Sequence, residues 1–309
     1  MNKNKIKLIF LENNFEKVKS IKKIKIGFTN KVYSINDKFI LKIYEDVNNK
    51  NNFEREVFLY NFFKDKIPVP RIILYDNSKN IYNKPFMIYN KIQGENLYSI
   101  WHLLNNFERR DIIKQLCKIL KVINKTSCKT FVKHFELNPS VDWHKKVYLK
   151  IRNLLKKVED KKLVSTKIIN AIKNFVTVNH SVLIEQKIAL VYWDTHFDNI
   201  IMKNNKIVGI LDFERTELAS IDYVLNIVKR MVNYPKKYVS KKFEKYAKKK
   251  DYSNLLIWFK EFYPELFEFK DLDKRLGLYS IEHDLNTLLD YPKSVELNKI
   301  IAKELNLNK

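Results

Sequence analysis

The hydrophobic pattern of the chain changes once, near residues 90–94, and this change limits the folds that the chain can adopt. Before it, short apolar runs are separated by turn residues and follow the two-residue period of strands, apart from one helical segment. After Gly94 the apolar residues recur at helical spacing. The expected strands span residues 24–26, 31–35, 39–44, 71–75 and 86–92, and the expected helices include residues 53–63, 107–124, 141–158 and 166–178.

We therefore predict an α+β fold with two lobes. The N-terminal lobe, residues 1–92, is expected to be a small antiparallel β-sheet with one helix, and the C-terminal lobe, residues 93–309, to be large and mainly helical. Short strands at residues 187–193, 199–202 and 207–211 interrupt the helices, the last two as a hairpin-like pair. From Ile221 onward the pattern is helical, with breaks at Pro235, Pro264 and Pro292.

The chain is strongly basic, with 59 Lys and Arg against 35 Asp and Glu and a formal charge of +24. Such an excess is compatible with a nucleic-acid or anionic-surface partner. The lysines are scattered through the whole sequence, however, and we interpret the local runs at residues 236–237, 241–242 and 248–250 as solvated helix faces. We therefore expect no nucleic-acid partner and only weak affinity for duplex DNA at physiological salt.

Cysteine content and hydropathy indicate the compartment. The two cysteines, Cys117 and Cys128, do not suggest a disulfide framework, which suits a reducing cytoplasm. No apolar run approaches the ~20 residues that a membrane span needs, and the apolar stretch at residues 8–11 is too short for a signal peptide. The protein is therefore expected to be cytoplasmic, without a membrane partner.

Three oxygen-bearing side chains follow short apolar strands in the second half of the chain. One strand leads to Asp194, Asn199 comes five residues later, and a further strand leads to Asp212. Phosphoryl transfer needs such a set: one carboxylate orients the attacking hydroxyl, while a second carboxylate and an amide oxygen bind Mg²⁺. Alternatively, Asp194 and Asp212 only cap turns at strand ends. The combination at this spacing favours kinase-like chemistry.

A lysine in the middle of an apolar strand is the second signal. Lys42 lies between Leu41 and Ile43, and a lysine that points inward must meet an anion. The nucleotide phosphates and Glu56 on the following helix are the candidate anions, with Glu54 as a rival because the helical phase is uncertain by a residue or two. The alternative is that Lys42 lies on an exposed edge strand.

Two further segments fit a nucleotide site. Gly27 forms a turn between two expected strands, which is weak evidence by itself. The strand that leaves the first lobe can offer backbone groups to an adenine edge. The residues expected to do so are Ile88, Tyr89, Asn90 and Lys91.

Together these segments resemble the aminoglycoside phosphotransferase and choline kinase-like superfamily, small-molecule kinases with the protein-kinase-like fold. The resemblance covers residues from about 24 to about 226. It implies that Asp194 is the catalytic base and that Asn199 and Asp212 are metal ligands. It also implies that Lys42 and Glu56 hold the nucleotide phosphates.

The same resemblance implies that Thr29 and Asn30, next to Gly27, cover the phosphates. The implied cofactors are Mg²⁺ and ATP or GTP as the phosphate donor, and the implied partner is a small-molecule acceptor, expected to be cationic. Three positions depart from the family pattern. The family usually has His at the position of Tyr192 and Gly at that of Trp193, and Asp222 falls outside the usual register.

The candidate acceptor contacts are His196, Glu214 and Glu217. His196 lies in the catalytic loop and can contact a phosphate or the acceptor, or hydrogen-bond nearby backbone. A cationic acceptor needs carboxylates beyond the metal ligands, but each of these acids can also be a solvated surface residue. Further acids in this part of the chain are Glu261, Glu265, Glu282 and Asp284, and Trp101, Trp143 and Trp258 either line an acceptor pocket or belong to the core.

We therefore predict a Mg²⁺-dependent kinase that transfers the γ-phosphate of ATP or GTP to a hydroxyl of a small molecule. An aminoglycoside is the specific expectation, and choline, ethanolamine or another amino alcohol or sugar is the alternative. A rival of another class is a nucleotide-binding pseudokinase or regulatory module, which Tyr192, Trp193 and the single loop glycine motivate.

Overall fold

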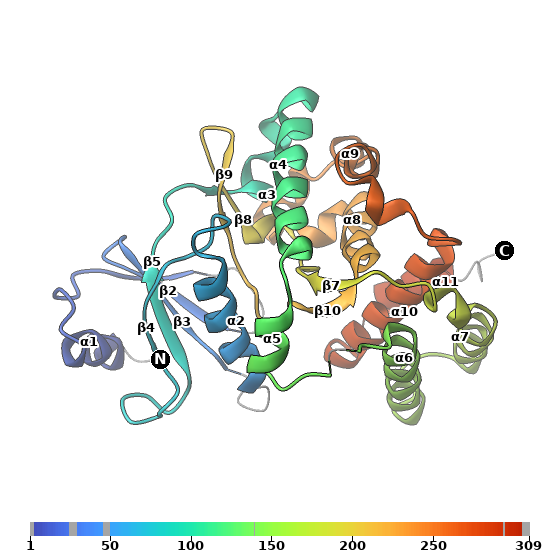
Figure 1. Cartoon of the computed structure of the whole chain (residues 1–309), viewed down its shortest axis with the longest axis horizontal. Helices are drawn as coiled ribbons and strands as arrows, with labels where there is room; N and C mark the ends of the chain where they lie inside the picture. Colours follow the sequence, from blue (N-terminus) through green and yellow to red (C-terminus); the bar gives the residue numbers. More distant parts are fainter. Residues whose placement is uncertain (1–2, 25–29, 46–49, 139, 293, 305–309) are drawn as a thin grey trace. The chain divides into compact units, whose positions relative to one another are not determined.

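The computed structural model describes residues 3–24, 30–45, 50–138, 140–292 and 294–304. The described residues form two compact units, the first from residues 1–122, 192–216 and 230–258 and the second from residues 123–191, 217–229 and 259–309. The helices are α1 (Lys3–Glu12), α2 (Lys50–Phe63), α3 (Leu97–Ile100), α4 (Asn106–Lys125), α5 (Lys129–His134), α6 (Trp143–Asp160), α7 (Thr166–Asn179), α8 (Val224–Asn233), α9 (Leu255–Phe262), α10 (Leu272–Asp290) and α11 (Val295–Glu304) (Figure 1). The strands are β1 (Ile21–Ile24), β2 (Lys31–Ile35), β3 (Phe39–Ile43), β4 (Ile72–Asp76), β5 (Phe86–Asn90), β6 (Glu95–Asn96), β7 (Ile188–Val191), β8 (Ile200–Lys203), β9 (Lys206–Ile210) and β10 (Glu217–Ser220).

An antiparallel five-stranded sheet in the order β1-β2-β3-β5-β4 forms the N-terminal part of the first unit. β3 is its middle strand, so the prediction of an inward-pointing Lys42 is confirmed and the edge-strand alternative is wrong. Successive side chains of a strand point to opposite faces. Leu41 and Ile43 therefore share one face, and Lys42 points to the other.

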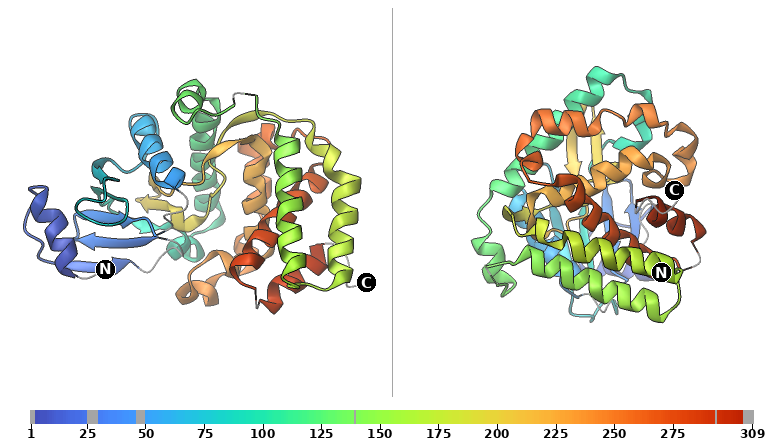
Figure 2. Two further views of the ribbon diagram at one scale, coloured as in Figure 1. Left: turned by 90° about the horizontal axis from the view of Figure 1, so that it is seen from below. Right: turned by 90° about the vertical axis from the view of Figure 1, so that its right-hand side faces the viewer.

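Helices cover both faces of this sheet, as the two views in Figures 1 and 2 agree. On the face of Leu41, α1 contributes Ile6, Ile9 and Phe10 to the core. On the face of Lys42, α2 contributes Glu56, which bonds the lysine. α1 was not among the predicted helices, although its buried residues have helical spacing.

The chain leaves the sheet through Gly94, which has a φ of +155°. A Cβ atom at this position would lie 2.4 Å from the carbonyl oxygen of Met202 and 2.8 Å from Ile201. Directly after Gly94, β6 pairs with β8, and β8 pairs with β9 in a three-stranded sheet. The predicted hairpin is thus confirmed, and Gly94 is needed because the backbone passes so close to it.

The second unit combines helices with a two-stranded ladder. β7 pairs with β10, which the sequence analysis did not predict. α6 and α7 lie side by side (Figure 2) and pack with α10. The buried guanidinium of Arg275 on α10 bonds both carboxylate oxygens of Asp222, at 2.7 and 3.0 Å. Asp222, the residue outside the family register, thus forms a core ion pair within this unit.

The segment after Pro235 was predicted as helix, but it forms three short 3₁₀ turns between Pro235 and Asp251. Its aromatic residues pack against neighbouring rings, as in the stacking of Tyr246 on His102. These contacts hold the segment in a form that differs from a regular helix. Within the described ranges no helix is long and apolar enough to cross a bilayer.

Candidate functional site

Lys42 is the centre of a buried polar cluster in the first unit. Its Nζ atom donates to Glu56 Oε2 at 2.6 Å and to Asp212 Oδ1 at 3.0 Å. The side chain of Lys42 is 7% exposed and that of Glu56 is fully buried. Glu54, the rival partner, is exposed. The helical phase therefore places Glu56, and not Glu54, on the face of α2 that meets the sheet.

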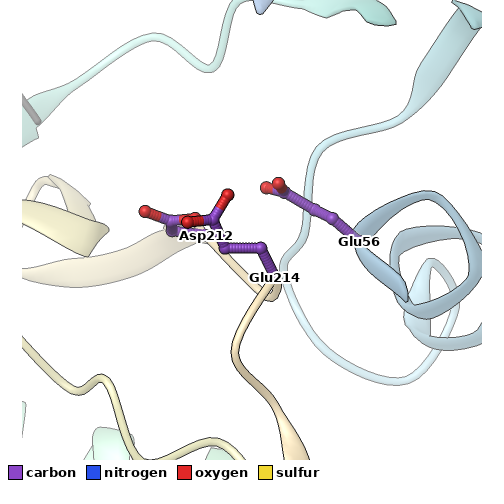
Figure 3. A group of neighbouring side chains, drawn as sticks. All are labelled: Glu56, Asp212 and Glu214. Carbon is purple, nitrogen blue, oxygen red and sulfur yellow. The ribbon is translucent and has the colours of Figure 1, made fainter. Parts of the chain in front are cut away.

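Two acids from one short segment complete the cluster. Asp212 and Glu214 follow β9 and lie next to each other, while Glu56 points toward them from α2 (Figure 3). The Nζ atom of Lys42 is 3.7 Å from Glu214 Oε2. Oxygen atoms of the three carboxylates lie within 4.8 Å of one another. One ammonium group is thus surrounded by three carboxylates, and the cluster carries excess negative charge.

The catalytic loop predicted from the sequence lies beside this cluster. The side-chain Nδ2 atom of Asn199 donates to the backbone carbonyl of Asp194 at 3.0 Å and closes the loop. The Leu211 N–H donates to the Asn199 carbonyl at 2.8 Å, which fixes the segment of Asp212 against the loop. The structure therefore brings together Asp194, Asn199, Asp212, Lys42 and Glu56.

His196 lies between two acids of the loop. Its Nε2 atom is 3.4 Å from Asp194 Oδ1 and its Nδ1 atom is 3.8 Å from Asp198 Oδ1. Its ring meets Tyr238 edge-on at 4.9 Å between centroids. The sequence analysis did not single out Asp198, although its place next to Asn199 was a signal. His196 thus contacts the loop acids and a neighbouring aromatic ring.

Burial and charge shift the proton affinities of these groups. Burial lowers the pKa of Lys42, but Asp212, Glu56 and Glu214 outweigh it and hold the pKa well above its usual value. Burial raises the pKa of Glu214 to about 7, against the opposing effect of Lys42. Burial also raises the pKa of Asp194, against the opposing effect of His196. A raised pKa makes a carboxylate a better proton acceptor.

The peptide unit that precedes the Asp212 side chain is held on both sides. The hydroxyl of Tyr192 donates to the Leu211 carbonyl at 2.7 Å. The Asp212 N–H donates to the hydroxyl of Tyr60, on α2, at 2.9 Å. Phe213 packs against both rings, with centroids 4.7 Å from Tyr192 and 5.7 Å from Tyr60. Tyr60 was not among the predicted site residues, though it follows Glu56 by four residues on the same helix face.

The predicted phosphate-covering turn is described only in part. Gly27 and Thr29 lie outside the described residues. Asn30 is described, and its amide nitrogen donates to Glu214 Oε2 at 2.7 Å. Its side-chain oxygen accepts from the Glu45 N–H at 3.3 Å. Asn30 therefore links the start of β2 to the acidic segment after β9.

The predicted adenine-recognition strand is β5, which pairs with β3 and β4 on its two sides through Ile88 and Tyr89. The Lys91 N–H donates to the Lys38 carbonyl at 2.8 Å. The Asn90 N–H donates to the Arg71 carbonyl at 3.4 Å. The N–H groups of Asn90 and Lys91 therefore already have acceptors within the first unit.

Glu217 belongs to the second unit, where it pairs with Lys146 at 2.5 Å. In the same unit Glu282 pairs with Lys150 at 2.6 Å and accepts from the Tyr223 hydroxyl at 2.6 Å. Both carboxylates therefore already have partners in that unit. Trp101, Trp143 and Trp258 are all buried, which agrees with the core interpretation.

The oxygen atoms of the loop suit a divalent cation. The Asn199 hydrogen bond uses the amide nitrogen and leaves the amide oxygen as a ligand atom. The Asp212 side chain is 35% exposed and can be reached from outside the cluster. Among the described residues, the buried Oδ1 atoms of Asp194 and Asp198 have no hydrogen-bond partner. Hard oxygen donors of this kind are the ligands that Mg²⁺ prefers.

Comparison with protein families gives a match over most of the chain. The family described as "Phosphotransferase enzyme family" (APH) matches residues 20–227. Comparison with curated proteins gives no match. The matched range includes every residue of the cluster around Lys42.

Solved structures with the same fold exist. The GDP and kanamycin complex of an APH(2")-type enzyme has a TM-score of 0.73 at 15% identity, over 99% of this chain and 98% of that chain. ADP-bound aminoglycoside phosphotransferase APH(2'')-Ib has a TM-score of 0.68 at 17% identity, over 99% and 96%. A complex of APH(4)-Ia with AMP-PNP and hygromycin B has a TM-score of 0.70 at 11% identity, over 97% and 96%. At these identities the likeness establishes the protein-kinase-like fold.

Proposed function

The chain belongs to the phosphotransferase enzyme family, and from this premise we propose that it transfers the γ-phosphate of ATP or GTP to a hydroxyl group of a small molecule. One observation carries the proposal. The ammonium of Lys42 and the carboxylate of Asp212, 170 residues apart in the chain, are 3.0 Å apart in the fold. In a phosphoryl-transfer site the phosphate-holding cation and the metal-binding acid act on the same phosphates, so they must lie within reach of each other.

In the proposed reaction Asp194 accepts the proton of the acceptor hydroxyl as that oxygen attacks the γ-phosphorus. The bond between this phosphorus and the β–γ bridging oxygen breaks, and ADP or GDP leaves. The raised pKa of Asp194 suits its role as proton acceptor. Lys42, oriented by Glu56, binds the nucleotide phosphates, and Asn30, at the start of β2, is the described residue proposed to cover them. Asn199 and Asp212 would hold Mg²⁺, which supplies positive charge to the phosphate oxygens when bound. The proposed division is a nucleotide-binding lobe of residues 1–92 and a catalytic and acceptor-binding lobe of residues 93–309.

The proposed acceptor is an aminoglycoside or a related amine-bearing alcohol. Structures with the same fold are described as complexes with kanamycin and with hygromycin B, and this supports the class of acceptor. Within the first unit the acids at the catalytic loop would attract a cationic group. His196 and Glu214 are the proposed contacts there, and Glu217 is a further candidate. An amino alcohol such as choline or ethanolamine is the alternative acceptor.

The test is turnover with a panel of acceptors. The protein is incubated with Mg²⁺ and ATP or GTP and with aminoglycosides, amino alcohols and sugars, and phosphorylated product is measured by mass spectrometry. We expect a product with at least one acceptor. Nucleotide binding without a product across the panel would favour the pseudokinase alternative instead.

The Asp194→Ala variant tests the proposed base. We expect it to lose at least about 100-fold in turnover, the usual contribution of a positioned base, while its nucleotide affinity changes little. The matched control is Asp65→Ala, whose carboxylate is largely exposed and pairs with Arg71 on the surface. An Asp194→Ala protein with wild-type turnover would show that another group takes the proton.

A further inference from the structure

One peptide unit of the site is hydrogen-bonded at both of its polar groups by buried tyrosines. The Leu211 carbonyl and the Asp212 N–H belong to the same peptide bond. The first accepts from the Tyr192 hydroxyl at 2.7 Å and the second donates to the Tyr60 hydroxyl at 2.9 Å. Both tyrosine side chains are only 1% exposed. The two tyrosine hydroxyls therefore fix the orientation of this peptide plane from both sides, and both side chains are buried away from solvent.

The residue that follows this peptide bond needs such support. Asp212 has a φ of +62°, in the left-handed region that residues with a Cβ atom rarely adopt. A strained conformation of this kind persists only where its surroundings hold it. Burial first, and the neighbouring negative charges second, raise the pKa of Tyr60 and Tyr192 well above their usual values. Both hydroxyls therefore keep their protons.

Helix α2 contacts both the lysine and the aspartate of the site. Glu56 and Tyr60 are four residues apart on α2 and so lie on one face of it. Glu56 bonds the Lys42 ammonium, and Tyr60 bonds the backbone of Asp212. A shift of α2 that broke one contact would strain the other. The position of α2 is thus tied to the phosphate-holding lysine and to the metal-binding acid together.

We propose that Tyr60 and Tyr192 are positioning residues, whose hydroxyls form a peptide clamp that presents the Asp212 carboxylate to the metal. This rests on the proposed function and extends it to two residues outside the reacting groups. Neither tyrosine touches the substrates in this role.

The variants Tyr60→Phe and Tyr192→Phe remove one oxygen atom each and keep the buried rings. A buried N–H or C=O group that loses its partner is costly, so we expect the Asp212 amide of Tyr60→Phe to exchange its hydrogen at least about tenfold faster. This is measured by hydrogen exchange on the full chain without nucleotide. An unchanged exchange rate in Tyr60→Phe would overturn the clamp, whatever the protein catalyses.

The second measurement is metal dependence. In both variants we expect the Mg²⁺ concentration for half-maximal nucleotide binding to rise by about tenfold, and turnover to fall by a similar factor, with the acceptor KM unchanged. Tyr192→His, which restores a donor, should recover part of the loss. The control is Tyr33→Phe, a buried tyrosine of the α1-covered core, which should change none of these values.

The outcomes separate the two proposals. If the wild-type protein neither binds Mg²⁺-nucleotide nor turns over any acceptor, the proposed function fails, and the exchange rates alone decide about the clamp. If the wild-type protein is active and both phenylalanine variants keep its metal dependence, the positioning role is wrong. Equal losses in Tyr192→His and Tyr192→Phe would also contradict it. Thermal unfolding of each variant verifies that it is folded.

Discussion

At the scale of single residues, the buried charge of Lys42 and the charges of its neighbouring carboxylates stabilise one another. Three carboxylates approach one ammonium group that is almost fully buried. The sequence predicted that this lysine points inward and meets an anion, because an apolar strand surrounds it. It left the choice between Glu54 and Glu56 open, since a shift of two residues in helical phase cannot be read from the sequence. Packing of α2 decides it.

Replacing this lysine should therefore cost stability as well as binding. In Lys42→Met the carboxylate of Glu56 stays buried without a cation, so we expect the free energy of unfolding to fall by roughly 3–5 kcal/mol. Nucleotide affinity should fall too. Lys31→Met is the control, because Lys31 pairs with Glu45 at the surface, and we expect it to change the free energy of unfolding far less than Lys42→Met does. Denaturant unfolding of the two variants gives the comparison, and similar losses would argue against the buried cluster.

Glu214 should give the protein a pH-dependent stability. Its pKa is raised to about 7 in the folded state by burial, against about 4.3 for a free glutamate. The folded protein thus binds more protons than the unfolded chain between these values, so its stability falls as the pH rises from about 4.5 to about 7.5. In Glu214→Gln this part of the decline should be absent. Melting temperatures across this range measure it, and parallel curves for the two proteins would refute it.

At the scale of elements, the sequence predicted the helices and strands that form from local hydrophobic pattern. It missed those that form only through tertiary contacts. The alternation at residues 31–35 and 39–44 and the helical spacing at residues 107–124 gave β2, β3 and α4 nearly as observed. β10 was missed because its four residues form a strand only by pairing with β7. The residues after Pro235 were predicted as helix because their lysines suit one, but aromatic packing holds them in 3₁₀ turns.

Gly94 lies at the boundary between the five-stranded sheet and the β6-β8-β9 sheet, where the backbone passes close to β8. A methyl group there would meet the backbone of Met202, which cannot move without disturbing β8, so we expect Gly94→Ala to cost at least about 2 kcal/mol of stability. Gly209→Ala is the control. Its added Cβ would lie 2.7 Å from the end of the Ile92 side chain, which can rotate away, and 3.3 Å from the Cβ atom of Ile201, so we expect a smaller cost than at Gly94. Thermal unfolding distinguishes the two. Equal costs would mean that the close approach at Gly94 is not limiting.

At the scale of the whole molecule, every described residue proposed for catalysis, metal binding or phosphate binding lies in the first compact unit. Local pattern predicted the polar residues of the site, because their chemistry is visible in their spacing. It could not predict the peptide clamp, because Tyr60 and Tyr192 look like ordinary core residues until the fold brings their hydroxyls to one peptide bond.

Nucleotide should therefore protect the chain unevenly. A ligand lowers local opening only where it binds, so we expect Mg²⁺ with a non-hydrolysable nucleotide to slow hydrogen exchange at residues 30–45, 53–63 and 192–214. The helices α6 and α7, in the second unit, should change little and serve as the internal control. Mass-spectrometric hydrogen exchange with and without nucleotide provides the measurement. Protection confined to the second unit would move the nucleotide site away from Lys42.

Of the four tryptophans, Trp101, Trp143 and Trp258 are buried, and Trp193 alone is partly exposed. Trp193 is also the residue directly before Asp194. Its indole emission depends on the polarity around it, whereas the other three rings are shielded from solvent. The protein thus carries an intrinsic fluorophore beside the carboxylate proposed as the base. Arrival of a ligand can therefore be followed as a change in emission without any added dye, and Trp193→Phe should silence that signal.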